Sequence, residues 1–119
     1  MRAYHVIVAA LLFALATIPA AHAHAFLDHA SPLVGGTVQS APREVSLVFT
    51  QNIESSFSSV EVTDSKGARV DAGKPQISGN TMRVALKPIG PGSYKVRWHV
   101  LSVDTHKTEG SFSFHVGNP

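Results

Sequence analysis

This 119-residue chain contains seven histidines and no cysteine. The histidines are therefore the side chains best suited to bind a metal or to take part in catalysis. The absence of cysteine excludes a disulfide framework, thiolate zinc sites, iron–sulfur clusters and cysteine nucleophiles. Two histidines stand out by their neighbours. His24 follows an alanine-rich segment, and His106 closes the run Asp104-Thr105-His106.

Residues 1–23 have the pattern of a cleaved secretory signal peptide. Arg2 is the only formal charge before Asp28, residues 6–16 form an apolar run, and Ala21-His22-Ala23 is an Ala-x-Ala ending. The apolar run is too short to span a bilayer, which takes about 20 residues. The pattern predicts cleavage before His24 and one mature domain, residues 24–119.

Two other cleavage positions stay open, and each would change the chemistry of the mature chain. The frame Ala23-His24-Ala25 would place the cut before Phe26 and remove His24. A cut before His22 would leave a histidine third from the amine, which forms a different copper(II) chelate. We favour the cut before His24 because it uses the earliest well-formed site after the apolar run.

A histidine at the first position of a chain offers two nitrogens, the free α-amine and the imidazole Nδ1, which close a chelate ring on a metal. In the run Asp104-Thr105-His106, the two outer side chains point the same way if the segment is extended. The amine and imidazole of His24, the imidazole of His106 and the carboxylate of Asp104 would together offer three nitrogens and one oxygen. Such a set, arranged in a plane, suits copper(II) better than it suits structural zinc, which prefers a closed tetrahedron. The Irving–Williams order also favours copper(II) at such ligands. The fold must bring His24 to this run, because spacing alone does not.

The remaining histidines are expected to have no direct role in a site. His5 and His22 leave with the signal peptide. His99 and His115 fall on the outward phases of predicted strands, so we expect solvated surface residues. His29 lies near the mature start, where a surface position is again the default.

The elements that must position these groups are predicted to be strands. After residue 24 the apolar residues alternate with period two and show no helical periodicity. Glycine, proline and asparagine fall between the alternating runs, so the pattern predicts an antiparallel sandwich or Greek-key barrel with one core. The inward positions are Val45, Leu47 and Phe49; Phe57, Val60 and Val62; Met82, Val84 and Leu86; Tyr94, Val96, Trp98 and Val100; and Phe112, Phe114 and Val116.

The charge balance argues against a nucleic-acid partner. Ten Lys and Arg residues oppose eight Asp and Glu, and removal of Arg2 leaves nine against eight, a surplus of one. Nucleic-acid binders need a clustered basic face to displace counterions. The sequence also contains no phosphate-binding glycine loop and no distinguishable Ser-His-Asp arrangement.

The sequence resembles the CopC family of periplasmic copper-binding (copper resistance) proteins over nearly its whole mature length. The first and last blocks of the resemblance are its specific parts. The matching segments are His24-Ala25-Phe26-Leu27, Ser31-Pro32, Leu47-Val48-Phe49, residues 57–64, Gly67, residues 92–98, Ser102-Val103-Asp104-Thr105-His106, Gly110 and Phe112-Ser113-Phe114.

The resemblance implies an immunoglobulin-like β-barrel or sandwich that binds one copper(II) ion. It assigns the amine and imidazole ligands to His24 and the remaining ligands to Asp104 and His106, with the aspartate the weaker or more distant partner. Such proteins buffer or carry copper outside the cytoplasm, often beside an inner-membrane copper transporter of the CopD type. No enzymatic activity is implied.

The chain departs from the family pattern in two respects. Some members carry a second, copper(I) site in a methionine-rich loop, whereas the mature chain here has only Met82, on a core phase. We therefore expect a copper(II)-only protein. Gln51 also stands where an acidic residue is expected.

Two other functions compete with a copper carrier. An N-terminal histidine with a second histidine also forms the copper brace of oxidative enzymes, although the small size and the core position of Trp98 argue against this. A structural or adhesive sandwich is the other alternative, since an Asp-x-His run is commonly a turn or a hydrogen-bonded surface pair. That alternative predicts weak metal binding that does not depend on the free amine.

Overall fold

The computed structural model describes residues 25–117, which form strands joined by turns and one short 3₁₀ turn. Within this range no helix is long and apolar enough to cross a membrane. In chain order the elements are β1 (Leu27–Ser31), β2 (Thr37–Val38), β3 (Glu44–Phe49), η1 (Ser55–Phe57), β4 (Ser59–Thr63), β5 (Asp71–Ser78), β6 (Thr81–Leu86), β7 (Gly92–Leu101) and β8 (Lys107–Val116).

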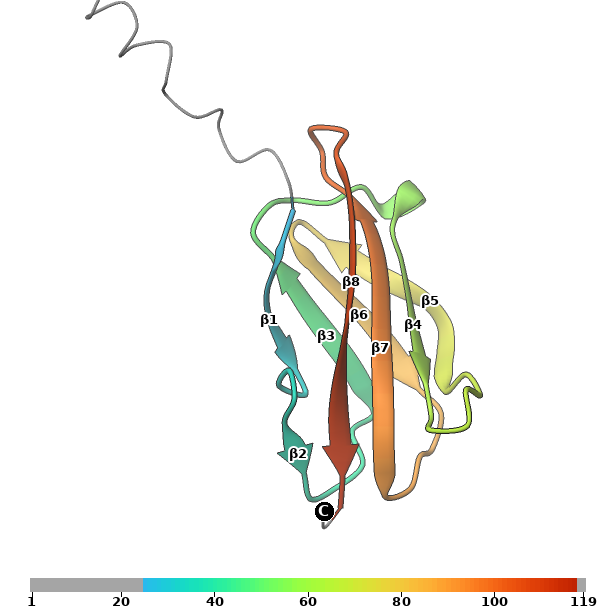
Figure 1. The fold of residues 1–119 in the computed structure, drawn as a ribbon. Coiled ribbons are helices and arrows are strands. Elements are labelled where there is room, and N and C mark those ends of the chain that lie inside the picture. Colours follow the sequence, from blue (N-terminus) through green and yellow to red (C-terminus); the bar gives the residue numbers. More distant parts are fainter. Residues whose placement is uncertain (1–24, 118–119) are drawn as a thin grey trace, which may run out of the picture.

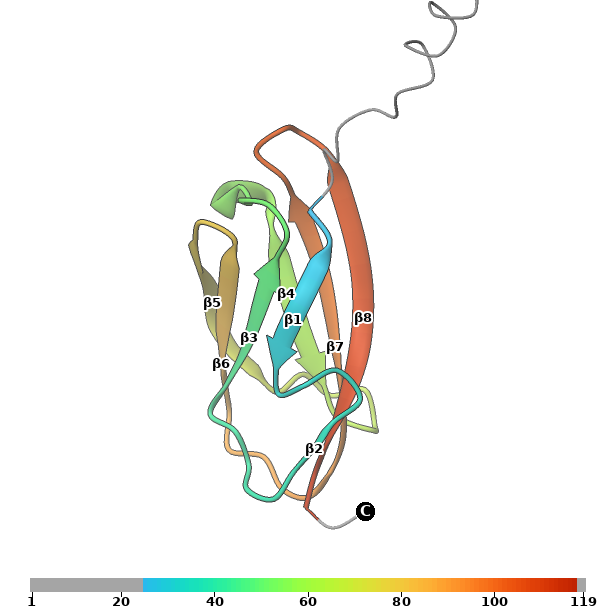
Figure 2. The same ribbon diagram turned by 90° about the vertical axis from the view of Figure 1, so that its left-hand side faces the viewer.

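The strands form two four-stranded sheets that face each other (Figures 1 and 2). One sheet has the order β1-β3-β6-β5 and the other the order β2-β8-β7-β4. The neighbouring strands pair antiparallel, except β2 and β8, which are parallel. The chain crosses between the sheets several times, as in a Greek key. The prediction of an immunoglobulin-like β-sandwich is therefore confirmed.

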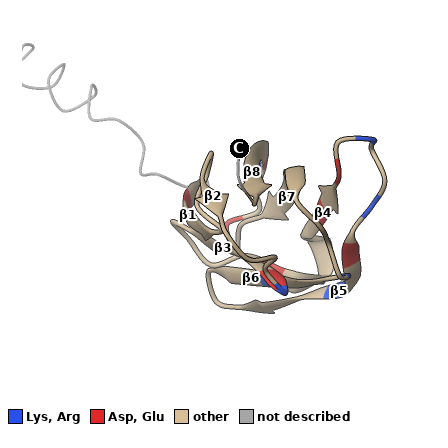
Figure 3. Cartoon of the chain, turned by 90° about the horizontal axis from the view of Figure 1, so that it is seen from below, with Lys and Arg blue, Asp and Glu red and all other residues tan. Residues whose placement is uncertain are grey.

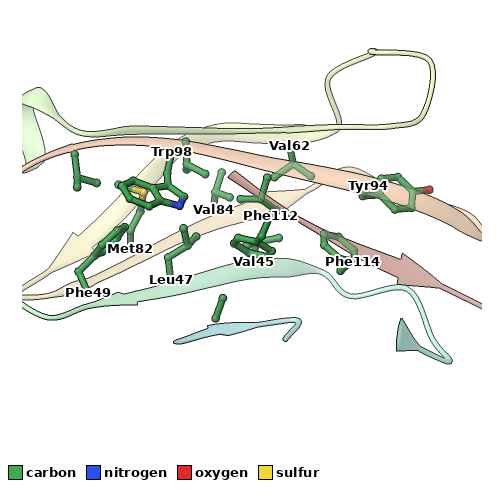
Figure 4. Packing of buried hydrophobic residues seen from close by; sticks show 14 of the residues in the cluster. Val45, Leu47, Phe49, Val62, Met82, Val84, Tyr94, Trp98, Phe112 and Phe114 are labelled. Atoms are coloured by element: carbon green, nitrogen blue, oxygen red, sulfur yellow. The ribbon is translucent and has the colours of Figure 1, made fainter. Parts of the chain in front are cut away.

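The core lies between the sheets and consists mainly of the alternating apolar residues that the sequence predicts (Figure 4), with Ala25, Ala30 and Ile53 in addition. Leu47 of β3 stands opposite Met82 of β6, and both side chains are fully buried. Met82 is thus a core residue, as expected. Trp98 is also buried and packs edge-on against Phe49, with the ring centroids 5.2 Å apart.

Gly110 makes room for the Trp98 indole. The two residues face each other across the β7–β8 pair. A Cβ atom at position 110 would lie 2.5 Å from Cζ2 of Trp98, which no side chain could tolerate without a shift of the ring. The glycine of β8 is therefore required by packing rather than by backbone conformation.

Three strands were not anticipated from the sequence, and one predicted position is wrong. β1 contains a register shift between Leu27 and His29, β2 has only two residues, and β5 contains a glycine and a proline. Bulges, prolines and short pairings weaken the period-two signal. Phe57, predicted at the start of a buried run, instead ends η1 with 72% of its surface exposed.

Charged residues are sparse, and one cluster joins β4 to β5. Figure 3, viewed from the end opposite the β7–β8 loop, shows basic residues in the β4–β5 connection. Arg69 donates to Asp71 over 2.7 Å, and the main-chain N–H of Val62 donates to the same carboxylate over 2.8 Å. Burial acts to raise the pKa of Asp71, but these hydrogen bonds and the Arg69 charge outweigh it and lower the pKa below its usual value.

The longest pairing in the molecule is the β7–β8 hairpin. Its register runs without interruption from Gly92 opposite Val116 to Leu101 opposite Lys107. The loop of residues 102–106 closes this hairpin at the end of the sandwich where β1 begins (Figures 1 and 2). The hairpin therefore carries both Asp104 and His106 to the place where the described chain starts.

Candidate metal centre

The loop that carries Asp104 and His106 is organised around Ser102, whose side chain is fully buried. The Ser102 carbonyl accepts a hydrogen bond from the Thr105 N–H over 2.9 Å, and the Ser102 N–H donates to the His106 carbonyl over 3.0 Å. The Ser102 hydroxyl also accepts from the His106 N–H over 3.2 Å. These three bonds draw residues 103–106 into a compact turn closed on Ser102, and those four residues are exposed.

The Asp104-Thr105-His106 segment is not extended, so the condition for its outer side chains to point the same way is not met. Thr105 has a φ of 70°, in the left-handed region, and the segment is a turn. The rule that residues two apart point to the same face of a strand therefore does not apply here. Asp104 and His106 are neighbours because one five-residue loop carries both, and not because of strand alternation.

A second segment supports this loop from the side. The Val103 N–H donates to the Asn52 carbonyl over 3.1 Å, and the Glu54 N–H donates to the Leu101 carbonyl over 2.8 Å. Between these two bonds Ile53 and Ser102 form an isolated bridge. The loop is thus fixed both by its own closing bonds and by the chain that follows β3.

The start of the described chain is anchored beside this loop. Ala25 is fully buried, and its carbonyl accepts a hydrogen bond of 2.6 Å from the Thr108 hydroxyl. Phe26 is tied to the other sheet, because its N–H donates to Thr50 Oγ1 over 3.0 Å and its carbonyl accepts from the Thr50 N–H over 2.8 Å. Position 25 therefore contacts β8 two residues after His106.

His24, the first predicted ligand, lies outside the described residues. Its placement relative to Asp104 and His106 stays a prediction. The peptide bond nevertheless sets its Cα about 3.8 Å from that of Ala25, whose anchoring on Thr108 is described. This fixed spacing between neighbouring Cα atoms is the reason for predicting that the N-terminal ligand lies near the loop.

The other histidines of the described chain make partnerships away from this loop. His99 faces solvent and pairs with Glu109, with 2.9 Å between Nδ1 and Oε2. His29 is likewise exposed and pairs with Asp28 at 2.7 Å. Both surface positions agree with the sequence analysis. His115 is half-buried instead of fully solvated, and its Nδ1 lies 3.1 Å from the Ser93 hydroxyl.

The donor chemistry of the loop fits part of a copper(II) site. Within residues 25–117 no group of three or more His, Asp or Glu side chains is placed to hold a metal ion. Asp104 and His106 supply one carboxylate and one imidazole, and copper(II) accepts donors of both kinds. An amine and an imidazole at position 24 would add further nitrogen donors.

Sequence reasoning did not single out Ser102 or Thr108 as parts of a site. Ser102 continues the inward phase of β7 one residue beyond its end, and Thr108 lies on the inward phase of β8; in both series the neighbours at two-residue spacing are mostly apolar. A polar residue in such a series is a signal that could have been noticed. It does not reveal which group the hydroxyl binds, because the partner of Thr108 is 83 residues away.

Comparison with known proteins places the whole described domain in one family. A family model, described as the CopC domain, matches residues 27–117. Protein YobA of Escherichia coli K12 is 33% identical over 111 residues, which cover 90% of each chain. The copper resistance protein C of Xanthomonas campestris pv. juglandis is 37% identical over 105 residues, which cover 81% of this chain and 82% of that protein.

A solved structure gives the same assignment. CopC from Methylosinus trichosporium OB3b is similar to this chain with a TM-score of 0.73 at 32% identity. The similarity covers 78% of this chain and 93% of that one. Together with the match of the family model to residues 27–117, this shows that the chain belongs to the CopC family.

Proposed function

We propose that this protein binds one copper(II) ion and buffers or carries it in the periplasm, as part of copper homeostasis or resistance. In this proposal the amine and imidazole of His24, the imidazole of His106 and the more weakly held carboxylate of Asp104 are the ligands. Family membership supports copper as the ion. The hydrogen bond between Thr108 and Ala25 carries the assignment of the site, because it ties the chain next to position 24 to the strand that follows His106.

The ligand set needs a free amine, so the proposal includes cleavage of residues 1–23 before His24. Copper(II) is the oxidation state that nitrogen and carboxylate ligands favour, whereas copper(I) prefers thioethers. Met82, the one methionine in the described chain, is fully buried in the core and offers no thioether to a surface ion. The protein is therefore a copper(II)-only member of its family.

The proposed role is transport or buffering, without catalysis. A copper-brace oxidase acting on polysaccharides would need an aromatic surface to hold its substrate. Trp98 and Tyr94 are both buried, so neither can stack on a sugar ring, and the aromatic rings exposed within residues 25–117 are single phenylalanines of two separate segments, Phe26 and Phe57. The ion would be exchanged with a partner, for which an inner-membrane copper transporter of the CopD type is the proposed candidate.

The test is to measure the intact mass of the exported protein and then titrate the same material with copper(II), following electron paramagnetic resonance. We expect a chain that starts at His24 and one axial, nitrogen-rich signal that saturates at one ion per chain. Binding should fail at low pH, because the amine and the imidazoles must lose protons to act as ligands. A chain that starts at Phe26, or a weak and heterogeneous signal, would refute the proposed site.

A further inference from the structure

The position of Thr108 in β8 is unusual for a polar residue. It stands on the inward phase of the strand, in series with Gly110, Phe112 and Phe114, and opposite the buried Val100 of β7. An apolar residue would continue the core at this position. Thr108 is instead half-buried at the end of the core, and its hydroxyl donates a hydrogen bond to the Ala25 carbonyl.

The Ala25 carbonyl needs a partner because Ala25 is fully buried. If a buried carbonyl loses its hydrogen-bond donor, the folded state still bears the free-energy cost of removing that carbonyl from water. The Thr108 hydroxyl supplies that donor at 2.6 Å. Phe26, the next residue, is bonded to Thr50 beyond the end of β3 in the other sheet. The first two described residues are therefore bonded to both sheets, and the bond to the sheet that carries Asp104 and His106 comes from Thr108.

We infer that Thr108 is a positioning residue for copper binding, which docks the mature N-terminus beside the loop of residues 102–106. The inference rests on the proposed function and extends it to a residue that does not touch the ion. Free movement of the N-terminal amine and imidazole would have to be lost on binding, which weakens affinity. The Thr108 hydroxyl restricts that movement, because it holds the carbonyl of Ala25, the residue next to His24.

The variant that tests this is Thr108→Val, which keeps the β-branched shape and removes only the donor. Thr108→Ser restores the hydroxyl, and Thr63→Val makes the same change in β4 at the end of that strand remote from the loop. Copper(II) affinity is measured by competition titration on mature protein that starts at His24. Loss of one hydrogen bond predicts an affinity about tenfold lower for Thr108→Val, with near wild-type values for the other two variants.

Two further measurements distinguish positioning of the N-terminus by Thr108 from a general loss of stability. In copper-free protein, nuclear magnetic resonance relaxation of the Phe26 amide should show greater mobility in Thr108→Val only. With copper bound, the paramagnetic resonance spectrum of that variant should show a smaller contribution from the amine nitrogen. An unchanged affinity in Thr108→Val, or a loss that Thr108→Ser does not rescue, would overturn the inference. Weak copper binding by the wild-type protein would instead refute the proposed function, and the Phe26 relaxation would still report whether Thr108 docks the terminus.

Discussion

The two segments that meet at the candidate metal centre are held in place in different ways. The loop of residues 102–106 closes on itself, through three hydrogen bonds between Ser102 and residues three or four positions further along. The Ala25–Phe26 segment is held by residues 83 and 24 positions away, Thr108 and Thr50. One half of the site is thus mainly local, with further support from the main chain of residues 52–54, while the other exists only once both sheets are assembled.

This contrast indicates where the site is vulnerable. Bonds that close a short loop cost less chain entropy than bonds between distant segments, so the turn depends less on the rest of the fold than the terminal segment does. A terminal segment tends to be poorly ordered unless specific contacts tie it down. Changes at the N-terminal half should therefore affect copper binding most, followed by changes of the loop ligands and then of the loop's support.

The largest effect is expected from an N-terminal extension, for example one glycine placed before His24. The extension converts the primary amine into a peptide nitrogen and abolishes the chelate of amine and imidazole. Copper(II) affinity should fall by more than the roughly 100-fold that marks the upper end for groups that only support metal ligands. Competition titration of extended and authentic chains measures this. Equal affinity of the two chains would show that the N-terminal half plays no part.

His106→Ala should give the next largest loss, at least about 100-fold, because it removes an imidazole ligand and not merely a group that supports one. The matched control is His99→Ala, which removes an exposed histidine paired with Glu109 on the same hairpin. The control should bind copper(II) like the wild type. If both variants lost affinity equally, the ion would be held by dispersed surface imidazoles and not by the loop.

Ser102→Ala tests how much the loop depends on its buried hydroxyl. The two main-chain bonds of Ser102 remain, and only the acceptor for the His106 N–H is lost. We expect a destabilisation of about 1 kcal/mol and a copper affinity lower by less than about tenfold. Chemical denaturation and copper titration on the same variant give the two numbers. A loss as large as that of His106→Ala would mean that the loop is not locally determined.

Asp71→Asn should leave copper binding unchanged, because the Arg69–Asp71 cluster lies between β4 and β5 and not at the hairpin loop. It should lower the free energy of unfolding by about 1–2 kcal/mol at neutral pH, through weakened hydrogen bonds to a side chain that is 6% exposed. The pKa of Asp71 is lowered in the folded protein, so this stabilisation is present above the usual aspartate pKa, about 4, and disappears as the pH falls through the lower folded value. Unfolding of both proteins between pH 7 and pH 2 should therefore show curves that converge in acid. Curves that stay parallel would contradict the assignment.

The local half of the site was largely accessible from the sequence. The run Asp104-Thr105-His106 is visible because its residue types are rare in the chain and closely spaced. Its conformation was left open between an extended segment and a turn, and the structure shows a turn, with a left-handed φ at Thr105 and closure on Ser102. The predicted five runs of alternating apolar residues are confirmed as strands, apart from the position of Phe57, because burial on one face imposes period two directly.

The long-range half was not accessible in the same way. A threonine in a strand is common, and nothing in the residues around Thr108 indicates a bond to Ala25. The strand β1, which leads away from Ala25, was also missed, because its register shift interrupts the alternation. Only the assembled sandwich brings these distant segments together.

The packing of Trp98 over Gly110 has a practical consequence for following this protein in solution. The chain has one tryptophan, so all tryptophan fluorescence comes from this indole. Its Nε1 is buried and has no hydrogen-bond partner among residues 25–117, which gives the excited state an apolar environment and emission at short wavelength. Unfolding transfers the indole to water and shifts the emission to longer wavelength. Gly110 is two residues from Thr108 on β8, so this built-in optical reporter lies at the same end of the core as the segment that holds the chain terminus.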